Sequence, residues 1–500
     1  MSLLRTIVIS AVLAGHSVPS VAAGQDKAFE RASAAVRARM AAIDILQGYI
    51  PGRAIIAVRA GGPAVVDVKG MTRLTSGRPA TEETPFYIAS MTKAFVGLMA
   101  VRLDANATLP LDTTLAEVFP DMRVAGVDLS KVTMRDALSH RLGFRVPPLN
   151  LRTAYTDTVP VASFPAIVSS AAVKIDETFK YDNLGYLLYA AALEARTGRS
   201  WRSWIDDLVF DPLGMTHSSA RTSDFDGISH LHMRFPDGLH EFAPKSDAIM
   251  HAAGGLVISP ADMARWLEAN VGGKSPIPRR QFAAAQATQV QLDMKEGQLS
   301  CTGYSLGWRT CEAMGLTFLE HGGGYTGMRT QMAILPDHGV GFAALFNSDS
   351  MTGGLSGQLM LAFLAGYAGK AEELPPPAAL AEKYVAMVAD LDASRAKDFA
   401  TERADPKWGG WAWRPAPAQL IELAGRYVNP VMGELRIGVE GEALSGRLNG
   451  TGLELEPAAR DLFAATLASD YELEALRFHR NAAGEVTGLD YLDRRFERKR

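Results

Sequence analysis

Apolar positions recur with two different spacings along the chain, and the spacing predicts which element forms. Residues 54–59 and 64–69 are apolar runs on either side of a Gly-Gly-Pro turn, a pattern typical of a β-hairpin. A spacing of three to four residues predicts an amphipathic helix over 29–45. The clearest helix is expected over 183–198, where the periodic segment ends at a glycine.

The order of these elements predicts the fold class. From about 103 to 298 the pattern is mostly helix and loop, and strand-like runs return between 304 and 347. Residues 355–367 are expected to form a helix that packs on those strands. A sheet built from both ends of a domain, with helices in between, is an α+β architecture. We therefore expect an antiparallel sheet flanked by helices, with an inserted and mostly helical subdomain.

The chain changes character after a run of three prolines at 375–377. A helix over 378–391 and a tryptophan-rich loop follow, and from about 419 short strand-like runs are separated by Gly and Asn turns. That pattern is typical of a small antiparallel meander or barrel. The predicted divisions are 24–372 for the first domain, 373–418 for a linker with a helix, and 419–500 for the barrel.

Residues 1–23 are expected to be a signal peptide. Arg5 supplies a positive start, residues 6–15 form a short apolar core, and small residues at 20–23 offer a cleavage site. A membrane-spanning helix needs roughly 20 apolar residues, about twice the length of this core. The mature chain is therefore expected to start near Ala23 or Gly24, to have no membrane span, and to be periplasmic or secreted.

Composition adds little beyond excluding some partners. The chain is 47% hydrophobic and 21% charged, as in ordinary soluble globular proteins, and its net charge is −4. No long basic run argues for a nucleic-acid partner. Export is compatible with a disulfide between the only two cysteines, Cys301 and Cys311, and two buried thiols are the open alternative. Two cysteines without nearby histidines make no zinc site, so neither a metal nor a cofactor is expected.

The candidate chemistry begins at Ser90. Lys93 follows it by three residues at the expected start of a helix, so the two side chains share one face. A serine hydroxyl becomes nucleophilic when a nearby base takes its proton. Backbone N–H groups at a helix start also favour developing negative charge. The alternative is an N-cap serine followed by a solvated lysine, which this motif alone does not exclude.

Two further segments favour the catalytic interpretation. Tyr181 and Asn183 fall on a turn before a helix, where a phenol near a lysine ammonium is expected to have a lowered pKa and to act as a base. The Asn183 amide can both donate to and accept from a substrate amide. His321 and the glycines at 322–324 end an apolar strand, where glycines let a substrate backbone approach closely.

In this order the three segments resemble the S-x-x-K, Y-x-N and K/H-x-G motifs of the penicillin-recognising serine hydrolases. That family comprises class C β-lactamases, D-Ala-D-Ala carboxypeptidases, and related D-aminopeptidases and esterases. The similarity covers roughly residues 30–370 and includes 133–144, 210–218 and 252–266. It implies a β-lactamase/transpeptidase-like fold. The segment from about 419 resembles the lipocalin-like barrel appended to some members.

The resemblance also implies roles for individual residues. Ser90 would attack the carbonyl and form an acyl-enzyme, with Lys93 and Tyr181 sharing the proton transfers. Backbone N–H groups of Ser90 and Gly324 would form an oxyanion hole. The implied substrate-binding residues are Asn183, which orients the substrate amide, and His321, Gly322, Gly323 and Gly324. His321 stands where β-lactamases usually carry lysine, which argues against efficient β-lactam hydrolysis.

The expected function is therefore hydrolysis of amide bonds in small peptides, with D-aminopeptidases and carboxypeptidases as the nearest types. The substrate would be a small molecule or short peptide. A carboxylesterase or weak β-lactamase with the same site is an open alternative. From another class, a sensor protein that is acylated by penicillin with little turnover also fits.

Three other motifs match known functional patterns but lack the sequence context that those functions need. Ser305 lies in a G-x-S-x-G segment, but polar residues precede it and no helix pattern follows, as a nucleophile elbow would need. The G-x-G-x-x-G at 322–327 is followed by a strand pattern, which argues against dinucleotide binding. His230 and His232 lack a clear third ligand, so a solvated loop is expected rather than a metal site.

Overall fold

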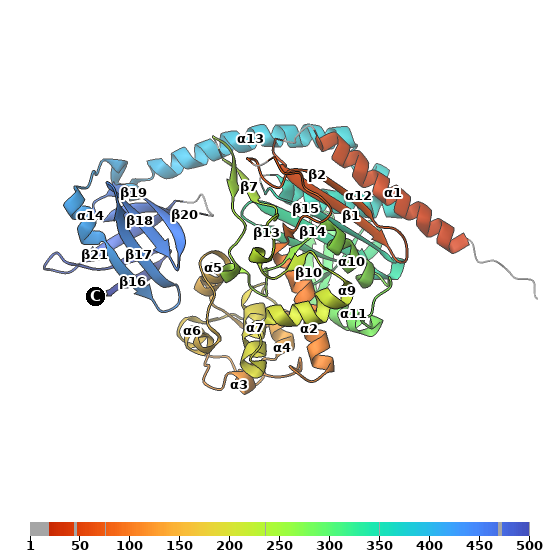
Figure 1. The fold of residues 1–500 in the computed structure, drawn as a ribbon, viewed down its shortest axis with the longest axis horizontal. Helices are drawn as coiled ribbons and strands as arrows, with labels where there is room; N and C mark the ends of the chain where they lie inside the picture. The colour runs from red at the N-terminus through yellow and green to blue at the C-terminus, as the bar shows by residue number, and fades with distance from the viewer. Residues whose placement is uncertain are drawn as a thin grey trace, which may run out of the picture.

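The computed structural model describes residues 20–44, 48–75, 77–235, 237–349, 351–468 and 473–499. They form a sheet with helices on both faces, a mostly helical region beside it, and a closed barrel joined to the rest by a long helix (Figure 1). The predicted α+β class and the small C-terminal antiparallel barrel are confirmed.

The central sheet has eight strands in the order β10-β11-β12-β13-β14-β15-β1-β2, and every neighbouring pair is antiparallel. The N-terminal hairpin β1–β2 joins the sheet through β15, so the sheet is built from both ends of the domain as expected. The strands are β1 (Gly52–Arg59), β2 (Val65–Gly70), β10 (Val290–Glu296), β11 (Leu299–Tyr304), β12 (Arg309–Ala313), β13 (Leu316–Tyr325), β14 (Met328–Leu335) and β15 (Val340–Phe346).

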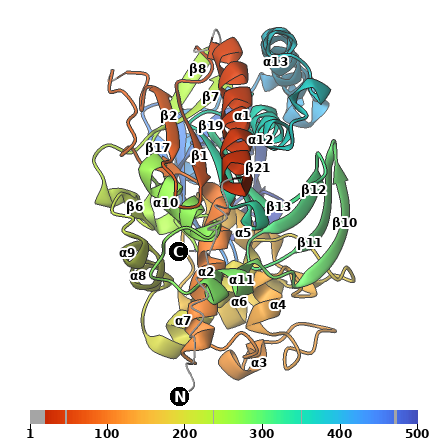
Figure 2. The ribbon, with the colours of Figure 1, turned by 90° about the vertical axis from the view of Figure 1, so that its right-hand side faces the viewer.

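Strand β1 is buried on both faces, and its side chains alternate between two cores. Ile55 and Ala57 join the core beneath the outer helices, whereas Ala54, Ile56 and Val58 face the core beneath the helical region. Figure 2 shows α1 (Ser20–Ile43) and α12 (Thr352–Ala368) side by side on the outer face. On the opposite face lie α2 (Thr92–Ala105) and α10 (Pro260–Asn270).

The inserted region is mostly helical, as expected. Its helices are α3 (Leu115–Val118), α4 (Met134–Leu138), α5 (Pro147–Tyr155), α6 (Phe164–Ala171), α7 (Leu184–Thr197), α8 (Trp201–Ile205), α9 (Asp211–Leu213) and α11 (Arg279–Gln286). Short strands β3 (Phe86–Tyr87), β9 (Val257–Ile258) and β6 (Ser218–Ser219) form a small sheet, and β4 (Phe144–Arg145) pairs with β5 (Val173–Lys174).

Three features of this part of the chain correct the sequence-based expectation. A hairpin of β7 (Leu231–Phe235) and β8 (Gly238–Phe242) replaces the expected solvated loop around His232, whose side chain is fully buried. Strand β10 lies in a segment expected to be helix or loop. Strand β11 forms from the polar run before Ser305, because its polar residues sit on a strand near the sheet edge.

The C-terminal unit is a closed barrel of β16 (Gly425–Asn429), β17 (Gly433–Glu440), β18 (Ala443–Leu448), β19 (Thr451–Ala459), β20 (Leu462–Leu467), β21 (Glu474–Arg480), β22 (Val486–Tyr491) and β23 (Arg494–Lys499). Apolar side chains from these strands and from α14 (Pro417–Leu423) form its core. Helix α13 (Pro377–Ala404) leads to the barrel (Figure 1). It extends beyond the expected 378–391, since no proline or glycine interrupts it before Pro406.

The sequence left open whether the two cysteines form a disulfide or remain buried thiols, and the structure has the disulfide: Cys301 on β11 is bonded to Cys311 on β12. Ser305 lies in the turn between these two antiparallel strands, where its buried hydroxyl donates to the Trp308 carbonyl. Such a turn lacks the helix that follows a nucleophile elbow.

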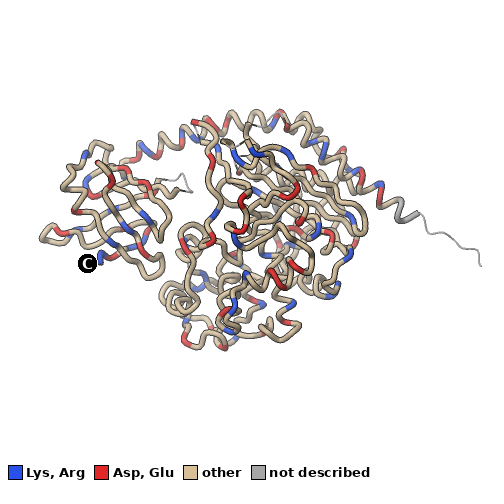
Figure 3. Tube along the Cα trace, viewed as in Figure 1, with Lys and Arg blue, Asp and Glu red and all other residues tan. Residues whose placement is uncertain are grey.

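Most of the predicted signal peptide, residues 1–19, lies outside the described residues, and residues 20–23 begin α1. Within the described ranges, none of the helices has the length and apolar character needed to cross a bilayer. Acidic and basic side chains are interspersed along the whole trace (Figure 3), which agrees with the small net charge of −4.

Candidate active site

Ser90 lies on a 3₁₀ turn, Ala89–Met91, that runs directly into α2. The preceding residue, Ala89, has a φ of +45°, which is uncommon for a non-glycine residue. Strained backbone of this kind concentrates at functional sites, where the surrounding structure holds it in place. Here the strained turn leaves Ser90 only half-buried while its neighbours Ala89 and Met91 are buried.

The Lys93 amine is the hub of the site. Its Nζ lies 3.0 Å from Ser90 Oγ, 2.8 Å from Asn183 Oδ1 and 2.7 Å from the Ala253 carbonyl oxygen. The two carbonyl-type oxygens can only accept hydrogen bonds. An uncharged amine has two N–H groups and one lone pair, so donating to both oxygens leaves the lone pair for the Ser90 hydroxyl. The three contacts therefore suit both protonation states: an ammonium donates to all three oxygens, and a neutral amine donates to the two carbonyl-type oxygens and accepts from the Ser90 hydroxyl.

Burial favours the uncharged form of Lys93. Lys93 is 0% exposed, and desolvation lowers its pKa from 10.5 to about 7, although the nearby Asp182 carboxylate opposes the shift. At neutral pH a substantial fraction of Lys93 is therefore uncharged. A lysine with an ordinary pKa would be almost fully protonated and unable to act as a base.

Tyr181 lies on the other side of Ser90. The residue is 44% exposed, and the Ser90 hydroxyl is close enough to affect the pKa of the Tyr181 phenol. The Lys93 Nζ lies 4.9 Å from the ring centroid. Burial raises the pKa of Tyr181 to about 12, despite the opposing effect of the Ser90 hydrogen bond. The expected lowering of this pKa is wrong, because desolvation outweighs a lysine that is itself only partly charged.

Strand β13 brings the glycine segment against the nucleophile turn. A Cβ on Gly323 would lie 2.3 Å from the Ile88 carbonyl oxygen and 2.3 Å from Thr330 Oγ1. Thr330 Oγ1 also donates to that Ile88 oxygen at 3.1 Å. Only a glycine permits this approach. The Gly322 and Gly324 Cβ positions meet side-chain atoms at 3.1 Å or more, so the steric demand falls on Gly323.

His321 is buried and uncharged. Its Nδ1 lies 2.6 Å from the Gly322 carbonyl oxygen, so Nδ1 carries the proton and donates. Its Nε2 then accepts from the Tyr304 hydroxyl at 3.3 Å. Desolvation, together with the nearby Lys93 and Arg309, lowers the pKa of His321 to about 3. The buried Glu320 forms an ion pair with Arg309.

The structure thus brings Ser90, Lys93, Tyr181 and Asn183 together and packs the glycine segment against the same turn. Two participants were missed from the sequence. Ala253 contributes only a backbone carbonyl, which no side-chain motif reveals. His140 packs against Tyr181 with ring centroids 4.4 Å apart. The segment around His140 was noted, but no role was expected for it.

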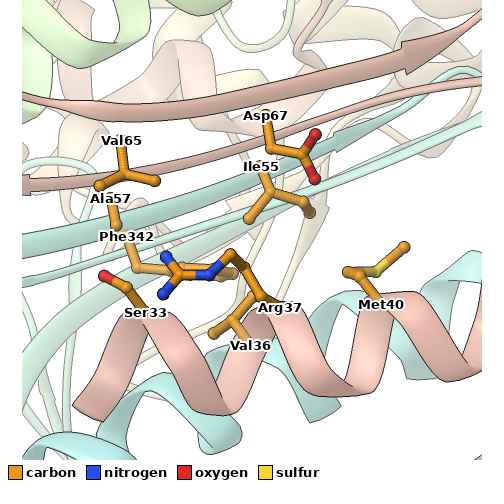
Figure 4. Close-up of a pocket in the computed structure, with 9 residues that line it drawn as sticks. All are labelled: Ser33, Val36, Arg37, Met40, Ile55, Ala57, Val65, Asp67 and Phe342. Carbon is orange, nitrogen blue, oxygen red and sulfur yellow. The ribbon is translucent and has the colours of Figure 1, made fainter. Parts of the chain in front are cut away.

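Two cavities are not lined by Ser90. One of about 20 Å³ sits between α1 and the sheet and is lined by residues of α1, β1, β2 and β15 (Figure 4). Another of about 80 Å³ is lined by helices of the inserted region and reaches His251. Neither is lined by Ser90, Lys93, Tyr181 or His321.

Comparisons with known proteins agree with this geometry. The chain belongs to the Beta-lactamase family, whose model matches residues 32–366, and it is a hydrolase of the serine β-lactamase and penicillin-binding-protein type. Residues 412–499 match a separate domain of unknown function, DUF3471.

Curated relatives are distant. Unguisins hydrolase ungD of Aspergillus violaceofuscus (strain CBS 115571) is 26% identical over 80% of this chain and 77% of its own length. Penicillin-binding protein 4 of Amycolatopsis lactamdurans is 27% identical over 61% of this chain and 82% of its own.

Solved structures share the fold at low identity. The octameric penicillin-binding protein homologue from Pyrococcus abyssi has a TM-score of 0.52 at 20% identity, over 93% of this chain and 99% of that one. D-amino acid amidase from Ochrobactrum anthropi SV3 has a TM-score of 0.57 at 17% identity, over 67% and 98%. EstCE1, a hydrolase with promiscuous acyltransferase activity, has a TM-score of 0.57 at 18% identity, over 69% and 100%.

Proposed function

We propose that this protein is a serine amidohydrolase that cleaves amide bonds of small peptides or amino-acid amides through an acyl-enzyme on Ser90. The observation that carries the proposal is the Lys93 hub, in which one buried amine reaches Ser90 Oγ at 3.0 Å while its N–H groups serve Asn183 and Ala253. An amine with a pKa of about 7 accepts the serine proton at neutral pH.

Tyr181 takes the complementary role. With its pKa raised to about 12, its hydroxyl keeps its proton until it donates it to the departing amine, and the proton that Lys93 took from Ser90 then passes to the tyrosinate. Backbone N–H groups of Ser90 and Gly324 stabilise the oxyanion, and Asn183 orients the substrate amide. In the second half-reaction, water replaces the leaving amine and the acyl group departs from Ser90 as a carboxylic acid.

His321 narrows the substrate class. A lysine at this position would present a cation to a substrate carboxylate. His321 is neutral instead, and its Nδ1–H donates to the Gly322 carbonyl oxygen. Arg309, the nearby cation, is paired with Glu320. These features favour substrates without a carboxylate beside the scissile bond, such as amino-acid amides, over penicillins and free C-terminal peptides. The likeness to D-amino acid amidase supports the same choice, with D-residues as the acyl side.

The test is a substrate panel with purified protein. D-alanyl-p-nitroanilide, D-phenylalanine amide, a p-nitrophenyl ester, a chromogenic cephalosporin and a D-alanyl-D-alanine dipeptide are compared by kcat/KM, beside Ser90→Ala. We expect the anilide and the amide to be turned over in preference to the dipeptide and the cephalosporin. Loss of Ser90 should lower kcat by roughly 10³-fold or more, as for a member of a catalytic unit.

Other outcomes would assign the site differently. Turnover of the ester alone would make the protein a carboxylesterase. Efficient cephalosporin hydrolysis would make it a β-lactamase, and stoichiometric labelling by a fluorescent penicillin without turnover would make it a sensor. Activity that survives Ser90→Ala would refute the proposed nucleophile.

We also propose that the chain is exported after cleavage near Ala23. The Cys301–Cys311 disulfide supports this, since such bonds persist in oxidising compartments. Expression of the full-length chain followed by intact-mass measurement of cell fractions tests it. A full-length mass found only in the cytosol would contradict export.

A further inference from the structure

His140 occupies an unusual position beside the site. It follows α4, is 3% exposed, and has a φ of +61° in the left-handed region. Non-glycine residues adopt that conformation rarely, and they keep it where surrounding contacts require it. His140 takes no part in the proposed proton transfers, so its contacts need a separate explanation.

Two hydrogen bonds from neighbouring residues converge on His140. The Lys180 N–H donates to the His140 carbonyl oxygen at 3.0 Å, and the Asp182 N–H donates to His140 Nδ1 at 3.2 Å. The two donors flank Tyr181 in the chain. The imidazole also packs on the Tyr181 ring, with centroids 4.4 Å apart and planes inclined by 38°. His140 therefore contacts Tyr181 and holds the residue on each side of it.

Ring contacts with Tyr304 and His321, at centroid distances of 6.4 and 6.1 Å, also limit where Tyr181 can lie. The residue is nevertheless 44% exposed, so a core packs around only part of it. Asp182 and Asn183 are linked to Asn150 and Lys93, respectively, but both of these contacts lie on the C-terminal side of Tyr181. The His140 carbonyl provides a restraint on the N-terminal side.

The protonation state of His140 is set by the same contacts. Because Nδ1 accepts from a backbone N–H, the proton of the neutral ring is on Nε2. Within the described part of the chain, that buried Nε2 has no hydrogen-bond partner. Leaving a buried N–H unpaired costs stability, and in native structures such a group calls for an explanation. Holding Tyr181 through the opposite ring nitrogen supplies one.

From these contacts we infer that His140 is a positioning residue: it clamps the 180–182 segment so that the Tyr181 hydroxyl stays at Ser90. The inference rests on the proposed function, in which Tyr181 protonates the leaving amine. Misplacing a reacting group by about 1 Å is enough to cost roughly 100-fold in rate. The clamp is thus expected to act on kcat, with little effect on KM.

The test is a double-mutant cycle on the full chain with D-alanyl-p-nitroanilide, whose leaving amine needs a proton. His140→Ala should lower kcat by roughly 100-fold and change KM by less than about threefold. In a Tyr181→Phe background the same substitution should have almost no further effect, because the group it positions is gone. Equal losses in the two backgrounds would overturn the inference and indicate a general packing role.

Two further variants separate the hydrogen bond from packing and folding. His140→Asn keeps an acceptor near the Nδ1 position and tolerates a left-handed φ, so it should restore kcat to within about tenfold of the wild type. Phe179→Leu removes a ring that packs edge-on against His140 at 5.7 Å but leaves both hydrogen bonds to His140 in place, and should change kcat by less than about threefold.

These outcomes are distinguishable from failure of the proposed function. If His140→Ala fails to fold, His140→Asn decides: a kcat as low as that of Tyr181→Phe in a folded protein would overturn the clamp. If Tyr181→Phe itself retains full kcat, or if the wild type does not turn over the anilide, the proposed function fails. Those two results do not depend on His140.

Discussion

At the scale of single residues, two lysines are buried without an ion-pair partner among the described residues. Lys93 serves Ser90, whereas Lys245 donates to the Tyr87 hydroxyl at 3.2 Å and lies 4.3 Å from the Tyr325 ring centroid. Desolvation lowers the pKa of both to about 7. The motif predicted which residues meet at Lys93, but the pKa values depend on burial, which no motif records. This is why the phenol of Tyr181 was assigned the wrong direction of shift.

The Lys93 pKa predicts the pH profile. Below about pH 7 Lys93 becomes protonated and loses the lone pair that accepts the Ser90 proton. We expect kcat/KM to fall about tenfold per pH unit on the acidic side of a midpoint near 7. Lys93→Arg, which stays protonated, should be inactive throughout. A profile that stays level down to pH 5 would contradict the assignment of Lys93 as the base.

Lys245 predicts a pH-dependent stability. Because its pKa is lowered on folding, the unfolded chain binds more protons between about pH 7 and 10.5, and stability rises with pH in that window. Lys245→Met removes this contribution. The variant should be more stable than the wild type below pH 7, by at most about 5 kcal/mol before the lost hydrogen bond is subtracted.

Urea unfolding at pH 6.5, 8.5 and 10.5 provides the measurement for Lys245→Met. The gain in unfolding free energy should shrink as the pH rises and vanish near 10.5, where the lysine is neutral in both states. Lys69→Met is the matched control, because Lys69 is exposed and paired with Asp44. A gain for Lys245→Met that does not change with pH would indicate a simple packing effect.

At the scale of elements, the periodicity of apolar residues predicted the helices and strands that are strongly amphipathic or bounded by turn residues. The hairpin of β1 and β2 and the helix α7 formed where expected, since a Gly-Gly-Pro turn and a C-terminal glycine mark their ends. Strands β10, at the edge of the sheet, and β11, next to it, were missed because both carry polar residues. The approach of β13 to the Ser90 turn could not be derived from its glycines, because it depends on tertiary packing.

Gly323 gives the element-scale prediction. A Cβ there would lie 2.3 Å from the Ile88 carbonyl oxygen, so Gly323→Ala must push β13 away from the nucleophile turn. We expect kcat/KM on the anilide to fall by roughly 100-fold, since displacing a reacting group by about 1 Å has this effect. For Gly322→Ala, whose Cβ meets a Gln331 side-chain atom at 3.1 Å, the loss should be markedly smaller. Equal kinetics for the two variants would show that β13 is not held against the turn.

At the scale of the whole molecule, the barrel touches the helical region next to the site. Arg152 of α5 donates to the Val431 carbonyl at 2.9 Å, and Thr451 donates to the Tyr155 carbonyl at 3.1 Å. The Tyr155 ring stacks on Tyr325 with centroids 5.1 Å apart, and Tyr325 directly follows Gly324. The sequence predicted a separate barrel but not this contact, because barrel loops and α5 share no local pattern.

Val431 tests whether the barrel supports the active site. Its side chain is 8% exposed and belongs to the core of the helical region, so Val431→Asp should lower the unfolding free energy by roughly 2 kcal/mol or more. It should also reduce kcat/KM on the anilide, since α5 loses its support. Val439→Asp makes the same change at a site 36% exposed and is the control. Indistinguishable melting curves and kinetics for the two would mean that the barrel does not support α5.

The central claim is that Ser90 becomes acylated because Lys93 removes its proton. The most direct measurement is mass spectrometry of the full chain after a brief reaction with p-nitrophenyl acetate and an acid quench, followed by peptide mapping. The account predicts one acyl group per chain on Ser90, and none at that position in Ser90→Ala or Lys93→Arg. Stoichiometric acylation that persists in Ser90→Ala, or that maps to a different residue, would contradict it.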